Sequence, residues 1–128
     1  MALMIDSRVY IDWRRKRFEF MPEIVRLHPA NPVFICGVIE AEVGRGILSA
    51  RQRDRFLEFT NLLYKIDTDE TIWKETGNLA WQLDRKGITL PLTDLTIVAC
   101  AKKAGATLVT LDSDFKKIPG LKVQNRLP

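Results

Sequence analysis

Short apolar runs alternate with longer stretches of helical periodicity along this chain, and this alternation constrains the possible folds more than any other feature. Residues 2–6, 32–36 and 106–110 form apolar or β-branched runs of strand length, and 118–123 contains a turn followed by a last short strand. Strands that are separated by helices pair in parallel through right-handed crossovers. We therefore predict an α/β fold, a three-layer α/β/α sandwich with a central parallel sheet.

The segments between these strands carry the signals of helices. Residues 50–64 place Phe56, Phe59 and Leu63 on one face at helical spacing, which is typical of an amphipathic helix. Four other helices are expected. One follows the first strand and ends at about Arg17, and one follows the second strand and contains Glu42. The last two run from 67 or 69 to Gly87 and from about 90 to Gly105.

The helix that ends at Gly87 has two possible first turns. Asp67 with Glu70 three residues later resembles a capping box, and Asp69 is the alternative N-cap. A glycine after the last helical residue is a common end signal. The side chains that this helix is expected to bury are Ile72, Leu79, Ala80 and Leu83.

The chain has the size and composition of one compact domain. With 128 residues, 46% of them hydrophobic, it can build a core without disulfides or metals, so we expect a single domain over 1–128. No apolar run approaches the roughly 20 residues of a membrane span. Charges follow the first apolar stretch, which is the reverse of a secretory signal. We therefore expect a soluble, cytoplasmic protein with no membrane partner.

Cysteine and histidine usage argues against a zinc site. Cys36 in VFIC and Cys100 in TIVACA have apolar neighbours and are expected to be reduced core residues. Because His28 is the only histidine, a tetrahedral site of nitrogen and sulfur ligands lacks donors. The candidates for chemistry are therefore carboxylates.

Four acidic residues lie beside apolar stretches in four separate segments. Asp6 closes the first strand, Glu42 lies in the helix after the second, Asp94 lies at the start of a helix, and Asp112 follows the strand 106–110. In a parallel sheet these positions converge at the carboxyl edge, where ligands bind. Carboxylates near a core are costly unless they are paired or bound to a cation. Mg²⁺ and Mn²⁺ prefer oxygen ligands, so the pattern predicts one carboxylate pocket for a hard divalent cation.

Each acid also has an ordinary structural interpretation. Asp6 could cap the following helix, Asp94 could complement a helix N-terminus, and Glu42 could be merely exposed. Either Asp112 or Asp114 could shape a turn. The joint placement of the acids at one sheet edge, rather than any single residue, favours the shared pocket.

The charge balance adds a modest indication of the partner. Twenty Lys and Arg against sixteen Asp and Glu give a net charge of +4, and acids gathered in one pocket would leave the remaining surface more basic. A polyanion partner is consistent with this, although a solvated helix face is the favoured explanation of any single cluster. The candidate patches are Arg14 to Arg17, then Arg51, Arg53 and Arg55, then Lys102, Lys103, Lys116 and Lys117.

Four sequence pieces, taken in order, resemble a known family. They are MIDSRVYIDW, the E-V-x-x-G pattern at 42–46, GITLPLTDLTIVACA around Asp94, and TLDSDF followed by IPGLKV. Together they resemble the PIN-domain ribonucleases, specifically the VapC-like toxins of type II toxin-antitoxin modules. The resemblance covers essentially the whole chain and implies a PIN-like version of the predicted sandwich.

The resemblance implies a role for each acid. Asp6, Glu42, Asp94 and Asp112 match the four acidic positions that hold Mg²⁺ or Mn²⁺ and act in catalysis, and Asp114 is a less certain further contributor. The hydroxyl residues that would orient these acids are Ser7 and Thr110. The implied activity is metal-dependent endoribonuclease cleavage that leaves 5′-phosphate and 3′-hydroxyl ends. The implied partners are RNA, a cognate antitoxin whose tail covers the pocket, and a second copy in a homodimer.

Arg8 departs from the family pattern, which usually has Asn or Ser two residues after the first Asp. A guanidinium there could pair with Asp6 or Asp94 and compete with a cation, could clamp a substrate phosphate, or could point outward. The first case gives an alternative function, a catalytically silent PIN-like module that binds RNA or protein with Arg8 in the metal pocket.

Two further interpretations stay open at this point. A receiver-like phosphoacceptor domain would also have an acidic cluster, but the lysine expected after a late strand is absent, because 106–110 leads into Leu111 and Asp112. Packing in the core or a dimer is favoured over base stacking for the three tryptophans. These are Trp13, Trp73 and Trp81.

Overall fold

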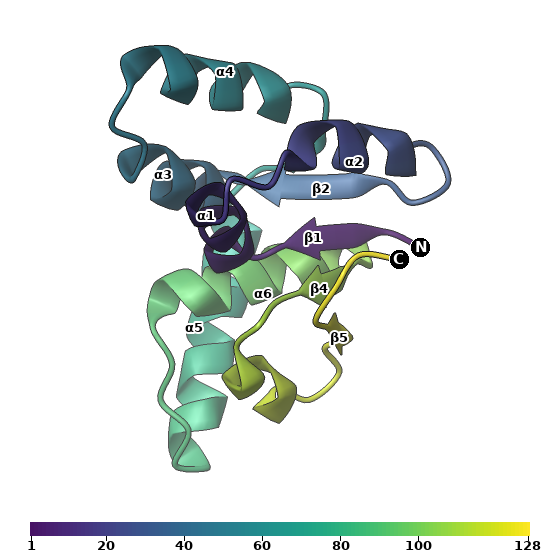
Figure 1. The fold of residues 1–128 in the computed structure, drawn as a ribbon. Helices are drawn as coiled ribbons and strands as arrows, with labels where there is room; N and C mark the ends of the chain where they lie inside the picture. Colours follow the sequence, from purple (N-terminus) through teal and green to yellow (C-terminus); the bar gives the residue numbers. More distant parts are fainter.

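The computed structural model describes all 128 residues and has a five-stranded sheet flanked by helices (Figure 1). The strands are β1 (Leu3–Ile5), β2 (Val33–Cys36), β3 (Tyr64–Ile66), β4 (Thr107–Val109) and β5 (Val123–Gln124). The helices are α1 (Ser7–Arg15), α2 (Phe20–Leu27), α3 (Gly37–Arg45), α4 (Ala50–Thr60), α5 (Glu70–Arg85) and α6 (Leu92–Ala104), with a 3₁₀ helix, η1 (Ser113–Lys117). No membrane-spanning helix is present, since no helix combines the length and the hydropathy that a bilayer crossing requires.

All strand pairs in the sheet are parallel, in the order β3-β2-β1-β4-β5. In the central strand, Leu3 lies opposite Val33 of β2 and Thr107 of β4. The carboxyl ends of β1, β2 and β4 therefore meet at one edge. This edge also receives the first turns of α1 and α3, because each follows its strand within one residue.

The helices form a layer on each face of the sheet, which confirms the predicted three-layer α/β/α sandwich (Figure 1). The chain moves from β1 through β2 to β3 with α1 to α4 on one face, and returns to β4 with α5 and α6 on the other. α1 packs on α3, and α5 packs on α6, which covers the sheet. Right-handed crossovers require this change of face when the strand order reverses.

The core is one continuous cluster of buried apolar side chains. Ile5 and Ile35 from the sheet and Ile97 from α6 are completely buried, as expected for strands covered on both faces. Cys36 and Cys100 are buried free cysteines in this core. The aromatic side chains of Tyr10 and Phe20 pack edge to face with ring centroids 5.3 Å apart.

Two elements differ from the sequence-based prediction. The expected helix 50–64 ends at Thr60, and Tyr64–Ile66 is the edge strand β3. This three-residue strand is too short and too exposed to show an alternating pattern. The helix α2 was not among the expected helices. Its Pro22 lies in the first turn, where the missing N–H has no helical partner.

The start of α5 decides between the two predicted caps. Asp69 is the N-cap, and its Oδ1 accepts a hydrogen bond of 3.0 Å from the Ile72 N–H. The capping box at Asp67 and Glu70 is therefore wrong, because Glu70 is the first residue of the helix.

The apolar face of α5 matches the prediction for three of its four residues. Ile72, Leu79 and Leu83 are buried, whereas Ala80 is half-buried. Core packing is wrong for two tryptophans of this helix, since Trp73 and Trp81 are 54% and 62% exposed. Trp13 is half-buried and stacks on Phe20 at 5.5 Å, so the packing interpretation holds for it.

Candidate functional site

Asp6 is a buried carboxylate at the point where β1 becomes α1. Its backbone N–H donates to the Val109 carbonyl at 2.9 Å, which ties this turn to the end of β4. The side chain forms no helix cap but accepts 2.9 Å and 3.4 Å hydrogen bonds from the hydroxyls of Thr110 and Ser7. Asp6 thus occupies the N-cap position of α1, but its side chain does not cap the helix. Both carboxylate oxygens instead face the sheet edge.

Burial is the main influence on the charge of Asp6. Desolvation raises its pKa above the usual range, although the Thr110 hydroxyl and the Arg8 guanidinium oppose this rise. The nearby charges of Asp94 and Glu42 raise the pKa further. An ionised Asp6 is thus held at a cost, which a cation at the site would reduce.

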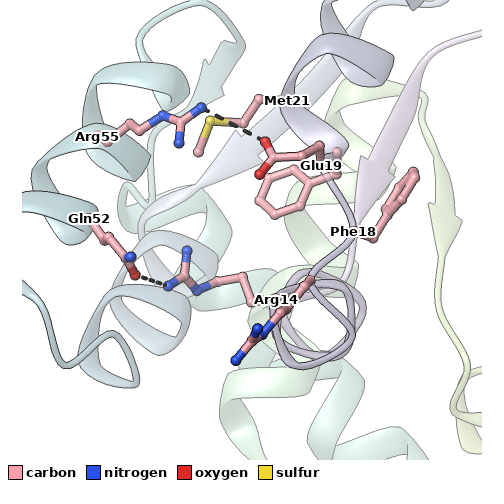
Figure 2. Close-up of a pocket in the computed structure, with 8 residues that line it drawn as sticks. Arg14, Phe18, Glu19, Met21, Gln52 and Arg55 are labelled. Carbon is pink, nitrogen blue, oxygen red and sulfur yellow. Dashed lines mark hydrogen bonds and ion pairs between the residues drawn. The ribbon is translucent and has the colours of Figure 1, made fainter.

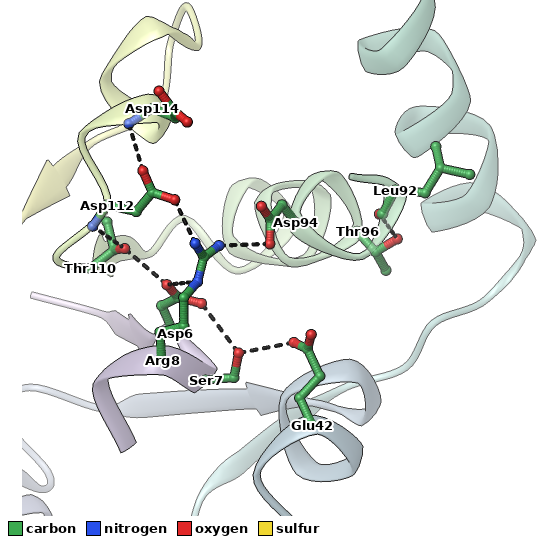
Figure 3. Close-up of polar contacts among 10 residues, drawn as sticks. All are labelled: Asp6, Ser7, Arg8, Glu42, Leu92, Asp94, Thr96, Thr110, Asp112 and Asp114. Carbon is green, nitrogen blue, oxygen red and sulfur yellow. Dashed lines mark hydrogen bonds and ion pairs between the residues drawn. The ribbon is translucent and has the colours of Figure 1, made fainter. Parts of the chain in front are cut away.

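The other three acids reach the same edge from separate elements (Figure 3). Glu42, in the second turn of α3, accepts a 2.9 Å hydrogen bond from the Ser7 hydroxyl. Asp94 lies in the first turn of α6, where its charge also suits the helix N-terminus. Asp112 caps η1 by accepting 2.9 Å from the Asp114 N–H. The structural roles of Asp94 and Asp112 therefore coexist with membership of the cluster.

Thr110 and Ser7 connect the acids to each other. The Thr110 hydroxyl donates to Asp6 and accepts a 3.1 Å hydrogen bond from the Asp112 N–H. The Ser7 hydroxyl lies between Asp6 and Glu42. These two hydroxyls orient two carboxylates, those of Asp6 and Glu42, and Thr110 also holds the backbone of Asp112 beside them.

Arg8 occupies the middle of the cluster (Figure 3). Its Nη1 lies 2.6 Å from Asp112 Oδ2, and its Nη2 lies 2.9 Å from Asp94 Oδ1. The Nε atom is 3.6 Å from Asp6 Oδ2. The guanidinium also lies over the Phe115 ring, 5.7 Å from the centroid. Arg8 thus points into the site, and the outward interpretation is wrong.

The carboxylates keep Arg8 charged. Burial lowers its pKa, but attraction to Asp6, Asp94 and Asp112 outweighs this effect, so the net pKa is raised. One guanidinium offsets one of the four carboxylate charges. The site therefore has capacity for more positive charge than Arg8 provides.

The donor chemistry of the site fits a hard cation, but the arrangement does not yet enclose one. The side-chain atoms here that could bind a metal are carboxylate and hydroxyl oxygens, which Mg²⁺ and Mn²⁺ prefer. However, no three acids are placed to bind a single ion, because the Arg8 guanidinium lies between Asp6, Asp94 and Asp112. A metal bound to these acids requires Arg8 to move, and its 47% exposed side chain has solvent to move into.

Asp114 lies at the margin of this arrangement. Its backbone N–H donates to Asp112, while its carboxylate pairs with Lys117 Nζ at 3.1 Å. The structure therefore separates the Asp114 carboxylate from Arg8. Phe115, which packs under the guanidinium, was not among the predicted site residues, although it belongs to the quoted string TLDSDF.

The buried charge of Asp6 predicts a gain in stability from Asp6→Asn. Asparagine can keep the Thr110 hydrogen bond without the cost of a desolvated charge, so we expect stabilisation of the order of 1 kcal/mol, about 4 °C in Tm at this size. Because the folded pKa of Asp6 is raised, the ionised form costs stability above that pKa. The difference in stability between Asp6→Asn and the parent should therefore shrink as the pH falls through the folded pKa of Asp6.

Thermal unfolding in EDTA from pH 7 to pH 4 measures this effect. Asp12→Asn is the control, because Asp12 forms a partly exposed i,i+4 pair with Lys16. A variant that is less stable than the parent at pH 7 would contradict the argument, since Arg8 would then compensate the Asp6 charge fully.

Comparison with known proteins identifies the family to which this chain belongs. Residues 3–121 match the PIN domain. The chain belongs to the PIN-domain family. It is similar to Ribonuclease VapC2 of Rickettsia felis, with 29% identity over 131 residues and 98% of each chain covered.

Solved structures agree with this assignment of a VapC-like PIN domain. VapBC2 from Rickettsia felis bound to a promoter DNA fragment has a chain with 26% identity and a TM-score of 0.82, covering 99% of this chain and 100% of that chain. VapBC-1 from nontypeable Haemophilus influenzae gives 25% identity and a TM-score of 0.78, with 97% of each chain covered. The recognised family and the PIN-like fold are therefore as the sequence motifs indicated.

Proposed function

We propose that this protein is a metal-dependent endoribonuclease, a VapC-like toxin that hydrolyses RNA phosphodiester bonds at the carboxylate cluster. The observation that carries the proposal is that three acids from separate segments, Asp6, Asp94 and Asp112, converge on the Arg8 guanidinium. The fourth acid, Glu42, is tied to the same cluster through the Ser7 hydroxyl. Asp6, Glu42, Asp94 and Asp112 would hold Mg²⁺ or Mn²⁺ once Arg8 has moved.

In this proposal the metal and the residues around it have separate roles. When bound, the metal supplies charge stabilisation and a water of lowered pKa as nucleophile. Ser7 and Thr110 keep Glu42 and Asp6 directed at the site through hydrogen bonds of 2.9 Å each. Asp114, which pairs with Lys117, is proposed only as an outer contributor that could hold a water.

The displaced Arg8 could serve the same reaction. Its side chain is anchored at the first turn of α1 and lies over Phe115, so its movement is confined to the mouth of the site. There the guanidinium would meet a substrate phosphate, for which its donors are well arranged.

An inhibited or silent module is the second candidate, and the Arg8 ion pairs favour it. If no metal displaces the guanidinium, the same surface binds RNA or a protein without turnover. This candidate shares the fold and all four acids with the nuclease, and it differs in whether a divalent ion enters.

A single assay separates the two candidates. Purified protein is incubated with a mixed RNA pool in EDTA, Mg²⁺ or Mn²⁺, and product ends are identified enzymatically. The nuclease predicts cleavage only with the divalent ion and products that have 5′-phosphate ends. RNA retention without cleavage under every condition would favour the silent module.

The proposed cellular partner is a cognate antitoxin. Solved relatives of this fold include a toxin-antitoxin complex from Klebsiella pneumoniae and VapBC complexes bound to DNA. A segment of the antitoxin would cover the carboxylate site. The proposed location is the cytoplasm, where RNA is available.

A homodimer is a further prediction, and α5 offers an exposed apolar face for it. Trp73 and Trp81 lie two turns apart with Gly77 between them, and a side chain added at Gly77 would meet no atom within 4 Å. This open space admits an indole from a second copy, and two-fold symmetry makes the contact reciprocal.

The α5 dimer is tested by light scattering after gel filtration. We expect the parent to have twice the mass of the chain and Trp73→Ala with Trp81→Ala to have the monomer mass. Leu48→Ala is the matched control, because Leu48 is fully exposed on another segment. A dimer that survives the double substitution would locate its interface elsewhere, and a monomeric parent would remove the homodimer prediction.

A further inference from the structure

A second charged feature lies away from the carboxylates, in a hollow between α1, the start of α2 and α4 (Figure 2). It has a volume of about 470 Å³. Three arginines line it: Arg14 in the last turn of α1, Arg17 two residues after that helix, and Arg55 in α4. We call it the arginine cleft. Its other lining residues are Phe18, Glu19, Phe20, Met21 and Gln52.

The arginines of this cleft have few internal partners. Arg14 Nη2 donates to Gln52 Oε1 at 3.1 Å, which is a neutral acceptor. Arg55 Nη2 is 3.8 Å from Glu19 Oε2, and both side chains are mostly exposed. Such a pair contributes little. The Arg17 side chain forms no ion pair or hydrogen bond, so most of the N–H donors face solvent.

Arg17 has an unusual backbone for an arginine. Its φ of 56° is in the left-handed region, and its N–H donates to the Arg14 carbonyl at 3.1 Å to close α1. Glycine or asparagine adopts this conformation at lower cost. A left-handed residue directly after a helix is a common helix end, so the turn at Arg17 closes α1 beside the cleft that Arg17 lines.

We propose that the arginine cleft binds phosphates of the RNA strand that leads to the carboxylate site, an inference that rests on the proposed nuclease function. Guanidinium groups match phosphate oxygens with two parallel donors. Phe18 is 43% exposed on the cleft wall and offers a ring on which a base can stack.

The position of the cleft suits a continuous strand. α1 begins beside the carboxylates and ends at the cleft, so Arg14 lies about 9 Å along the helix axis from Arg8. Arg51, one turn before Arg55 on α4, lines an adjoining hollow together with Arg55. Cations that continue from one hollow into the next fit a chain of regularly spaced phosphates better than an isolated carboxylate.

Binding measured without metal tests the proposal separately from catalysis. Fluorescence anisotropy of a labelled single-stranded RNA in EDTA compares the parent with Arg17→Gln combined with Arg55→Gln. We expect Kd to rise about 10-fold or more. The slope of log K against log salt should also become shallower by about 1.4, which is 0.7 for each of the two phosphate contacts removed. Lys86→Gln with Lys122→Gln removes the same charge elsewhere and should leave both quantities near the parent values.

The outcomes distinguish the cleft from the nuclease proposal. Equal RNA affinity and salt slope in the parent and the arginine variant would overturn the cleft, whatever the cleavage assay gives. A protein that cannot cleave RNA but shows the expected loss of binding would support the cleft and contradict the nuclease. Arg55→Gln alone, which leaves α1 unchanged, should give an intermediate loss.

An acidic protein segment is the other ligand that arginines attract. Polyglutamate is therefore titrated against the same variants. If the double substitution removes polyglutamate binding and leaves RNA affinity unchanged, the cleft binds acidic protein and the RNA proposal is wrong. A loss confined to RNA, or larger for RNA, supports it.

Discussion

Asp94→Asn is expected to reduce metal-dependent RNA cleavage by at least about 10²–10³-fold, because a metal site of this kind contributes several kcal/mol to the reaction. Asp94 Oδ1 faces the Arg8 guanidinium at 2.9 Å, at the position that a cation would take. Asparagine preserves the size of the side chain and a carbonyl acceptor, but it removes the negative charge. The fold should remain, since the rest of α6 is unchanged.

Glu42→Gln should have a similar effect on cleavage for the same reason. Glu42 is linked to Asp6 through the Ser7 hydroxyl, and glutamine can keep that 2.9 Å hydrogen bond. Loss of activity would then follow from the missing charge rather than from lost positioning. Glu75→Gln provides the control, because it makes the same chemical change at an exposed position of α5 that has no ion pair.

The measurements are initial rates of RNA cleavage over a range of Mg²⁺ and Mn²⁺ concentrations, with Tm recorded for each protein. If Asp94→Asn and Glu42→Gln cleave at the rate of the parent, the carboxylate cluster is not the catalytic site. If both rates recover at high metal concentration, the acids act in binding the cation.

The topology explains why so much of the acid cluster follows from the sequence. Asp6 and Asp112 come directly after apolar strand segments, and Asp94 comes at the start of a long apolar helix. In a parallel sheet all such positions lie at the carboxyl edge. Local sequence and chain order are therefore sufficient to predict that these acids lie close together.

The features that sequence did not reveal depend on tertiary placement. β3 has only three residues, two of them exposed, and it is a strand because β2 offers it a parallel partner. The direction of Arg8 depends on acids that are 86 and 104 residues away in the chain. No local pattern distinguishes an arginine that points into such a site from one that points to solvent.

Replacing Arg8 by Asn is expected to raise Mn²⁺ affinity about 10-fold or more and to lower the stability of the metal-free protein. In the parent, the guanidinium must leave Asp94 and Asp112 before a cation can bind. Asparagine removes this competitor and supplies a neutral oxygen. Without metal, the carboxylates then repel each other, so Tm in EDTA should fall.

Added Mn²⁺ should reverse this loss of stability. An ion that binds only the folded state stabilises it by RT ln(1 + [L]/Kd), so the Tm gain on adding Mn²⁺ should be larger for Arg8→Asn than for the parent. Calorimetric titration gives the two affinities directly. Arg8→Lys is the control, because it keeps a positive charge and should keep weak metal binding.

RNA cleavage by the same variants then assigns the role of Arg8. Higher metal affinity with higher activity would mean that Arg8 restrains a latent nuclease. Higher affinity with lower activity would mean that the displaced guanidinium binds substrate phosphate. Equal Mn²⁺ affinity in the parent and Arg8→Asn would contradict the competition, because the ion pairs to Asp94 and Asp112 would then present no barrier to the metal.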